Sequence, residues 1–462
     1  MGLQALEQYG EDNVAFFCDN AKDKWGTFIH GIEVLSFEQM VKVHRAYEIL
    51  VTPVNNFSMI AQLENSQISN YKIYIDKEAS VITKGKKDEK LFEYQNSILE
   101  EYSIKTDGLD MLSDIAKFQK LAENIQYISK QEKISLTYEG YNSEGCYYGN
   151  VQNLLKYAGV ETENIKFIPI VSHQDCVPLY SVGTQYHNSV IFPGTYFKKE
   201  VHRHFPYIPV FSVGPYIHYA NGIYSRKQID IIKKQNGRTL LVYMPHSIEN
   251  IDREFSKKKF VDNVLQHYRN EFSKIFLCMY WADVNDPICE YAMEKGMTVV
   301  SAGFRFDKKF NSRQKSLLEL ADAVVFGDIG TFISYALYLK KPVGRIEMTD
   351  NSTISDKQYT SEDEKKLQFN LEYKRYCKQF YNIFSDELRL NKCMYEWSDP
   401  LNGFDQVKTP DEIREIISIS KDIIEECDDR LNKYEEAVNS VLLKYKKNDE
   451  RKYNILKEAT SI

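Results

Sequence analysis

Residues suited to holding an anion follow apolar runs in the stretch between Gly237 and Glu347. The residues of interest at the ends of these runs are His246 and Ser247, Tyr280, Arg305, and the pair Gly330-Thr331. Arginine can grip a phosphate through two parallel hydrogen bonds. A helix that starts at Gly330-Thr331 adds free backbone N–H groups and the positive end of its dipole. The pattern predicts a site for a phosphate-bearing ligand.

Each of these residues also has a plainer interpretation. His246 can be satisfied by nearby backbone, and Arg305 can form a surface pair with Asp307. Thr331 can act as a simple helix N-cap, which is compatible with phosphate contact. For Tyr280 and Trp281, aromatic core packing competes with a role beside a nucleobase or sugar.

The elements that must position these residues are the strands of a parallel α/β sheet. Four short apolar runs between Gly237 and Glu347 each end in small or polar residues, and helical patterns follow most of them. In such sheets, ligands bind at the carboxyl ends of the strands. Further strands are predicted upstream at 134–137, 165–171, 189–194 and 208–214. The predicted fold class is therefore α/β.

A chain of 462 residues is too long for one ordinary core. The predicted division is an accessory α/β module at 1–105, a first α/β domain at 106–225, a second at 226–400, and C-terminal helices at 401–462. A single amphipathic helix is expected at 410–447, from isoleucines at helical spacing such as Ile413, Ile416 and Ile423. These helices are expected to pack back on the N-terminal half.

Bulk composition excludes some classes of function. With 43% hydrophobic and 27% charged residues the chain is globular, and a net charge of −7 gives no support to nucleic-acid binding. The basic clusters 257–259 and 446–447 could touch an anionic membrane surface, although solvated helix faces explain such runs more often. No signal peptide is expected, and the sequence contains no apolar run of membrane-spanning length. Any membrane contact is expected to be peripheral, and a homo-oligomer is possible.

The eight cysteines include no C-x-x-C pair, which argues against a zinc ribbon or a redox motif. Their scatter through apolar runs indicates free thiols in a reducing, cytoplasmic setting. No D-x-D motif follows a predicted strand, and no third ligand accompanies His202 and His204, which are expected on a solvent-facing loop. We therefore expect no metal and no cofactor.

The order of these parts resembles the bacterial polysaccharide glycosyltransferases of the B fold, over roughly residues 130 to 350. The stretches that carry this resemblance are 244–247 (Met-Pro-His-Ser), 278–283 (Cys-Met-Tyr-Trp-Ala-Asp), 300–307 and 330–337. The resemblance implies two Rossmann-like domains in tandem, with the C-terminal helices returning across them.

A narrower resemblance is to sialyl- and polysialyltransferases. Tyr138-Glu139-Gly140 is similar to their carboxylate-glycine motif. Pro245-His246 has the reverse order of their His-Pro motif, and Gly330-Thr331 stands where that family has two hydroxyl residues. This resemblance implies a CMP-linked sugar as the donor.

The resemblance implies transfer of a sugar from a nucleotide-sugar to a glycan or glycolipid, as in capsule or lipopolysaccharide assembly at the inner face of the membrane. Glu139 would be the base that takes the acceptor proton, with Glu144 as second choice. His246, Arg305 and Thr331 would hold the donor phosphate, so that fixed cations and dipoles replace a metal in an inverting displacement. Ser247, Tyr280 and Gly330 complete the predicted donor site. The plainer interpretation of Glu139 is a turn or cap residue.

The N-terminal region resembles the small Rossmann module that senses nucleotide-sugars in bacterial polysaccharide enzymes. The residues that carry this resemblance are 16–20, Gly26 and 31–34. The family's glycine-rich turn before the first helix has no counterpart here except Gly2. Asp19 could contact a ribose, or the module could serve packing and assembly.

Three other functions remain open at this stage. A nucleotide-sugar epimerase would share the same plan and need no acceptor. A polyol-phosphate transferase would hold its donor equally well at a helix N-terminus. A non-catalytic assembly subunit would use the incomplete N-terminal module.

Overall fold

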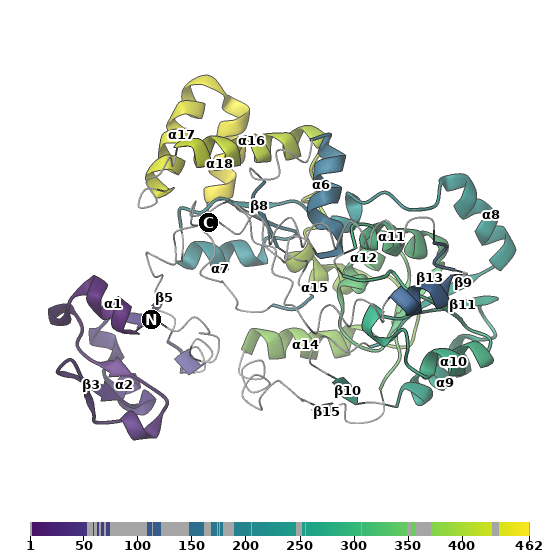
Figure 1. Ribbon diagram of the computed structural model, residues 1–462, viewed down its shortest axis with the longest axis horizontal. Helices are drawn as coiled ribbons and strands as arrows, with labels where there is room; N and C mark the ends of the chain where they lie inside the picture. Colours follow the sequence, from purple (N-terminus) through teal and green to yellow (C-terminus); the bar gives the residue numbers. More distant parts are fainter. Residues whose placement is uncertain are drawn as a thin grey trace.

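The computed structural model shows a mixed α/β fold with parallel sheets and a helical C-terminal part (Figure 1). The residues that it describes are 2–52, 59, 62–63, 66–68, 71–73, 109–112, 114–121, 147–160, 168–172, 174, 176–178, 189–204, 206–245, 252–254, 256–305, 307–348, 353–355, 371–426 and 434–461.

The larger sheet has five parallel strands in the order β12-β11-β9-β13-β14. The strands are β9 (Thr239–Tyr243), β11 (Lys274–Cys278), β12 (Thr298–Val300), β13 (Ala323–Phe326) and β14 (Val343–Arg345). If the strands are numbered 1 to 5 along the chain from β9, the order across the sheet is 3-2-1-4-5, as in a Rossmann-like sheet. The parallel α/β sheet expected in this part of the sequence is confirmed.

Helices cover both faces of this sheet. They are α8 (Arg226–Asn236), α9 (Lys257–Tyr268), the short η7 (Trp281–Asp283), α10 (Ile288–Glu294), α11 (Phe310–Leu320) and α12 (Thr331–Tyr338). Leu240 and Val242 of β9 belong to one core cluster, whereas Leu241 and Tyr243 belong to the other. Because successive strand residues point to opposite faces, the apolar runs bury both sides of the sheet.

Local sequence signals determine where α8 begins and ends before the first strand of this sheet. Ser225 and Gln228 form a reciprocal capping box at the start of α8, which satisfies backbone N–H groups of its first turn. Gly237 ends the helix with φ 64°, a backbone conformation that glycine adopts without strain. The apolar run of β9 follows directly, so the helix-to-strand change is encoded within a few residues.

The smaller sheet has three parallel strands in the order β6-β7-β8. Its elements are η4 (Tyr147–Gly149), α6 (Asn150–Ala158), β6 (Ile170–Val171), β7 (Val190–Phe192), α7 (Tyr196–His204), β8 (Val210–Ser212) and η6 (Tyr216–His218). His202 lies in α7 with only 2% of its surface exposed, and its Nε2 lies 2.9 Å from the Ile208 carbonyl oxygen. The expectation that His202 faces solvent on a loop is wrong, because its helix packs on this sheet.

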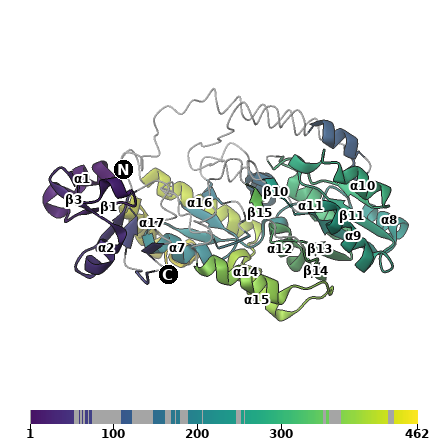
Figure 2. The ribbon, with the colours of Figure 1, turned by 90° about the horizontal axis from the view of Figure 1, so that it is seen from below.

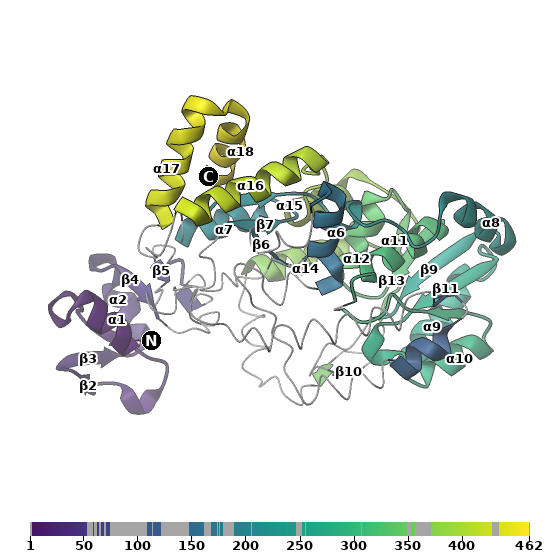
Figure 3. The ribbon, with the colours of Figure 1, turned by 45° about the horizontal axis from the view of Figure 1, so that its top comes forward.

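The C-terminal helices contact both α/β parts (Figures 1 and 3). They are α14 (Leu371–Ile383), α15 (Lys392–Asn402), α16 (Pro410–Glu426), α17 (Tyr434–Asn448) and α18 (Glu450–Thr460). Helices α16 and α18 lie against the smaller part, whereas α14 packs on β13 of the larger sheet. Helix α16 lies against α6, where Arg414 donates to the Ala158 carbonyl oxygen at 2.6 Å. Helix α18 lies against β8, and Lys198 of α7 donates to the Glu458 carbonyl oxygen. Seen from below, α14 and α15 run along the lower side of the molecule (Figure 2).

The single helix expected at 410–447 is wrong, because α16 and α17 are separate helices that pack against each other. A continuous helix of that length would extend roughly 57 Å, and the isoleucine stripe would have little to pack on over much of it. Folding back buries Ile416 and Ile423 of α16 together with Val438 of α17 in one cluster.

Gly194 marks a close contact between the smaller sheet and α15. A Cβ at this position would lie 2.3 Å from the Pro400 carbonyl oxygen and 2.7 Å from the Asn402 nitrogen. Both are backbone atoms, so they cannot move aside as a flexible side chain would.

We expect Gly194→Ala to lower the free energy of unfolding by about 1–3 kcal/mol through overpacking. Urea unfolding of the variant measures this. Gly296→Ala is the matched control for contact, because no atom lies within 4 Å of its Cβ position and the cost there comes from φ 88° alone. Equal stability of the wild type and the Gly194 variant would contradict the close contact.

The N-terminal elements form a separate small α/β unit (Figures 1 and 3). They are α1 (Gly2–Tyr9), η1 (Glu11–Asn13), β1 (Phe17–Cys18), η2 (Lys22–Lys24), β2 (Phe28–Ile29), β3 (Ile32–Leu35), α2 (Phe37–Val43), η3 (His44–Ala46), β4 (Ile49–Val51) and β5 (Tyr71–Ile73). Strands β1 and β3 pair in parallel, as do β4 and β5, whereas β2 pairs with β3 in the antiparallel sense. The Asp19 carboxylate accepts hydrogen bonds from the Ala21 nitrogen (2.9 Å) and Lys24 Nζ (2.7 Å), so its contacts here are local.

Two short strands, β10 (Asp252–Glu254) and β15 (Thr353–Ser355), form an antiparallel pair. Among the helices in the described part of the chain, none has the length and apolar character needed to cross a membrane.

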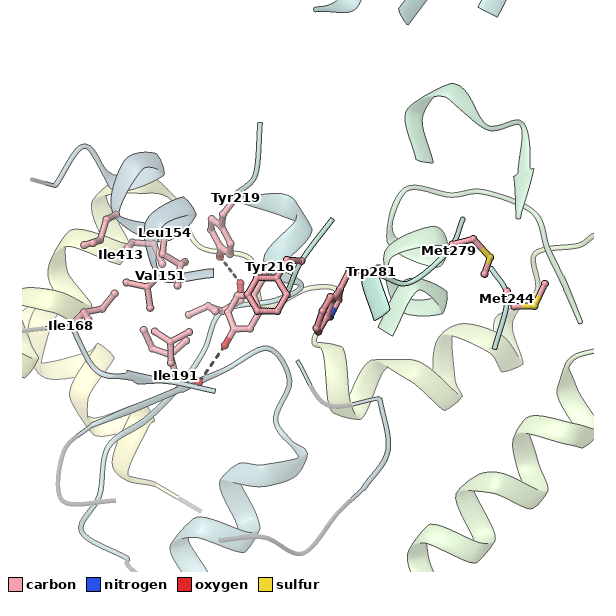
Figure 4. Packing of buried hydrophobic residues seen from close by; sticks show 14 of the residues in the cluster. Val151, Leu154, Ile168, Ile191, Tyr216, Tyr219, Met244, Met279, Trp281 and Ile413 are labelled. Atoms are coloured by element: carbon pink, nitrogen blue, oxygen red, sulfur yellow. Dashed lines mark hydrogen bonds between the residues drawn. The ribbon is translucent and has the colours of Figure 1, made fainter. Parts of the chain in front are cut away.

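One continuous core cluster joins the smaller sheet to the larger one. In Figure 4, Leu154 of α6 and Ile413 of α16 lie on one side, and Met244 and Met279 after β9 and β11 lie on the other. Trp281 belongs to the same cluster and lies between these two groups in the view. The two α/β parts are thus packed together through apolar side chains.

Candidate functional site

The carboxyl edge of the larger sheet has a switch point between β9 and β13. From β9 the chain continues to one side through β11 and β12, and β13 then resumes on the other side of β9. Sheets of this kind bind ligands in the crevice at this position. The segments that leave the two strands start at Met244 and at Gly327. A Cβ on Gly327 would lie 2.7 Å from the Pro245 side chain, so the two segments touch.

Gly330 and Thr331 form the start of α12 at this switch point. Gly330 is the N-cap residue, has extended backbone and provides no side-chain cap. A Cβ on Gly330 would lie 2.2 Å from the Phe332 ring, and that ring stacks on Tyr243 at 4.2 Å with an interplanar angle of 6°. Glycine is therefore required for this aromatic packing as well as being suited to a close approach by a ligand. The N-terminal end of α12 has the positive dipole that favours an anion.

Thr331 is the first residue of α12, and its side chain contacts the other α/β part. Its hydroxyl donates to the Gln174 carbonyl oxygen at 3.2 Å. Gln174 follows β6, so the carboxyl ends of β6 and β13 meet here. The plain N-cap interpretation of Thr331 is wrong, because Gly330 holds the cap position.

A ring of hydrogen bonds fastens the first turn of α12 to the segment after β6. Gln174 Nε2 donates to Ser334 Oγ at 2.9 Å, and Ser334 Oγ donates to the Thr331 carbonyl oxygen at 2.7 Å. The Gln174 amide also donates to Asn402 Oδ1 of α15 and accepts from the Tyr216 nitrogen at 3.3 Å. Only 1% of Gln174 is exposed. This glutamine therefore links four elements at the candidate site.

Arg305 lies in the loop after β12 and is partly buried. Its carbonyl oxygen accepts from the Tyr148 nitrogen at 2.5 Å, which is a second contact between the two α/β parts. We call the contact made by Tyr148, Gln174, Arg305, Thr331 and Ser334 the seam. The seam joins the end of β6 and η4 to the ends of β12 and β13.

Asp307 does not lie at the surface, contrary to the plainer interpretation of Arg305 as half of a surface pair. Asp307 is fully buried, and its Oδ2 accepts from Arg313 Nη1 at 2.6 Å. Arg313 Nη1 also donates to the Ala302 carbonyl oxygen at 3.1 Å. The buried pair therefore braces the loop that carries Arg305.

Of the two aromatic residues after β11, Tyr280 is partly buried and Trp281 has 3% exposure. Trp281 packs edge-on against Phe304 at 4.6 Å, so its core-packing interpretation is confirmed. Tyr280 lies near Tyr148, whose phenol it influences electrostatically. The structure thus brings Tyr280, Arg305 and α12 to one edge. Glu139, Glu144, His246 and Ser247 lie outside the described residues.

Sequence reasoning missed His218, which follows β8 in η6. Its Nδ1 lies 2.7 Å from the Tyr338 hydroxyl of α12, and its Nε2 lies 3.4 Å from the Tyr157 hydroxyl of α6. Burial, followed by the nearby Lys315 charge, lowers the pKa of His218. A neutral imidazole between two tyrosines ties the two α/β parts together. The aromatic run Tyr216–Tyr219 at a strand end was the one available signal.

Several thiols are unsuited to nucleophilic chemistry. Burial raises the pKa of Cys18 and Cys377 to about 11, and that of Cys278 and Cys289 to about 12. These four thiols stay protonated at neutral pH, so they offer no thiolate. Within the described ranges, no group of three or more His, Cys, Asp or Glu side chains is arranged to hold a metal ion.

Comparison with family models and with curated protein sequences gives no match for the chain. The residues at the seam are therefore the basis on which a function is proposed.

Proposed function

We propose that the chain is a glycosyltransferase that moves a sugar from a nucleotide-sugar donor to a hydroxyl group of a glycan or glycolipid. The observation that carries the proposal is the seam. There, the segments that follow β6 and β13 meet through Gln174 and Thr331, and the loop after β12 contacts η4 through Arg305 and Tyr148. The return of α16 and α18 to the smaller sheet supports the same two-domain B arrangement.

The proposed roles follow from charge: positive groups hold the donor phosphates, and a carboxylate takes the acceptor proton. The donor phosphates would bind the start of α12 at Gly330-Thr331 and the Arg305 guanidinium, with His246 and Ser247 completing the site. Tyr280 would lie beside the nucleotide. Glu139 remains the proposed base.

In the proposed step, the acceptor oxygen attacks the anomeric carbon as its proton passes to Glu139. The bond from that carbon to the donor phosphate oxygen breaks, and the leaving nucleotide takes the electron pair. Arg305 and the α12 dipole stabilise this charge without a metal ion. A single displacement of this kind inverts the anomeric configuration.

We expect Arg305→Met to weaken donor binding by about 10- to 150-fold, which corresponds to one charged hydrogen-bonding group. The measurement is a thermal-shift titration with CMP-, UDP-, GDP- and CDP-linked sugars, since a ligand that binds the native state raises Tm. Arg226→Met is the matched control, because the Arg226 side chain is 93% exposed and pairs only loosely with Asp230 of the same helix, at 3.9 Å. Unchanged affinity in the Arg305 variant would remove that residue from the site.

A second function has one observation in its favour. Five large apolar side chains are exposed on the N-terminal unit, namely Leu3, Tyr9, Phe28, Val43 and Tyr47. Such exposure suits a subunit of a polysaccharide-assembly complex. If no nucleotide-sugar shifts the Tm of the wild-type chain and none is turned over, this non-catalytic function is favoured over transfer.

A further inference from the structure

Tyr148 has a backbone conformation that tyrosine rarely adopts. Its φ and ψ are 63° and 8°, and Gly149 follows with 72° and 24°. Two consecutive residues are thus left-handed. Glycine adopts this region freely, whereas other residues pay a conformational cost. A tyrosine kept at such a position points to a role for its side chain.

The loop that carries Tyr148 is fixed against the loop after β12. The Tyr148 nitrogen donates to the Arg305 carbonyl oxygen at 2.5 Å. A Cβ on Gly149 would lie 2.3 Å from the Lys308 carbonyl oxygen, so the two backbones are in direct contact. These contacts hold the phenol of Tyr148 at the seam.

The phenol lies where residues from several elements converge. The Tyr148 ring is 4.7 Å from the Phe310 ring at the start of α11. The groups that act electrostatically on the phenol are Tyr280, Arg305, Tyr335 and Cys176. They come from the ends of β11, β12 and β6 and from α12. Burial raises the pKa of Tyr148 well above its ordinary value, so the hydroxyl stays protonated and can donate at neutral pH.

Neutral polar groups without hydrogen-bond partners gather beside Tyr148. Asn311 Nδ2 donates to Asn150 Oδ1 at 2.8 Å, and both side chains are fully buried. Asn150 Nδ2 and Asn311 Oδ1 make no hydrogen bond, and the Tyr335 hydroxyl lies beside the Asn311 side chain. Exchanging oxygen and nitrogen in both amides still leaves one donor and one acceptor unused. Buried polar groups are nearly always paired, so this cluster requires a partner.

We propose that Tyr148, Asn311 and Tyr335 form a subsite for the hydroxyl groups of the donor sugar. This inference rests on the proposed glycosyl transfer and adds the residues that recognise the sugar. Sugar hydroxyls donate and accept hydrogen bonds, which matches uncharged amides and phenols. The phosphates are served instead by the charge of Arg305 and the α12 N-terminus. Sugar and phosphate are thus recognised by different groups of residues.

The test compares a nucleotide-sugar with its own nucleotide, with Kd measured by titration calorimetry for the wild type and Tyr148→Phe. The variant keeps the ring on Phe310 and removes only the hydroxyl. We expect its affinity for the nucleotide to be unchanged and its affinity for the nucleotide-sugar to fall about tenfold. Tyr291→Phe on α10 is the control, because it removes a phenol hydroxyl that bonds Asp262 instead.

Asn311→Leu separates sugar recognition from a purely structural role, such as holding a buried water molecule. A sugar subsite predicts that the ratio of nucleotide-sugar affinity to nucleotide affinity falls in this variant. A structural role predicts a lower Tm with that ratio unchanged. An unchanged ratio in both variants overturns the subsite while leaving glycosyl transfer in place. A wild-type chain that binds no nucleotide-sugar overturns the proposed function, and the subsite fails with it.

Discussion

Replacing Asp307 with alanine is expected to lower the free energy of unfolding by roughly 3–5 kcal/mol, because it leaves a buried guanidinium without its counter-charge. Arg313 is 1% exposed, and its Nη1 bonds both Asp307 Oδ2 and the Ala302 carbonyl oxygen. The Arg313 guanidinium also lies 5.3 Å from the centre of the Phe118 ring, which does not replace a carboxylate.

Urea unfolding measures the loss, and an exposed ion pair supplies the control. Lys392 and Glu396 are 2.9 Å apart on α15, and both side chains are more than half exposed. Glu396→Ala should change stability by only about 0.5 kcal/mol, because water screens such pairs. The double variant Asp307→Leu with Arg313→Met should be more stable than Asp307→Ala alone, since it removes both charges. A loss below about 1 kcal/mol in Asp307→Ala would contradict a desolvated pair.

The Asp307–Arg313 pair also stabilises the loop that carries Arg305 of the candidate site. Asp307 Oδ1 accepts from the Lys309 nitrogen at 2.8 Å, and Arg313 holds Ala302, so the loop is tied down on both sides of Arg305. The same loop also accepts the hydrogen bond from the Tyr148 nitrogen, at the Arg305 carbonyl oxygen. Loosening it would disturb the phosphate contact and the proposed sugar subsite together.

The sequence predicted the larger sheet well because its signals are local. Four of its five strands are short apolar runs that end in small or polar residues, and each can be recognised without knowledge of its neighbours, whereas β14 (Val-Gly-Arg) is no such run. Parallel strands bring such ends to one edge. That rule is enough to place Tyr280, Arg305 and Gly330 at the same edge, as the structure does.

What the sequence missed depends on contacts between distant parts of the chain. Gln174 bonds a residue 160 positions away and another 228 positions away, and His218 bonds one 120 positions away. No periodicity or motif at these positions signals such partners. Asp307 was misjudged for a related reason, since charge alone does not reveal that Asp307 forms a buried pair with Arg313, six residues later.

The single helix expected at 410–447 shows a different limit. Periodicity shows which face of a helix is apolar. It does not show how long the surface is on which that face packs. Once α16 has covered α6, further helix in the same direction would leave its apolar face in water, and α17 packs back on α16 instead.

Gln174→Leu is expected to lower the free energy of unfolding by roughly 3–5 kcal/mol, because it leaves the Tyr216 nitrogen and Asn402 Oδ1 without Gln174 in a buried setting. The leucine is similar in volume, so the effect arises from hydrogen bonding more than from packing. Donor affinity should fall as well, since Ser334 and the first turn of α12 lose their tie to the segment after β6.

Gln406→Leu is the matched control, because the Gln406 amide bonds only the exposed neighbour Asp405 among the contacts that the structure describes. Its stability should stay within about 0.5 kcal/mol of the wild type. A double-mutant cycle with Asn402→Leu then isolates the pair: removing both amides should cost less than the sum of the single losses by about 0.5–3 kcal/mol. Strict additivity would show that the two amides do not interact. A large stability loss with full donor affinity would show instead that the seam holds the two α/β parts together without positioning α12 for the donor.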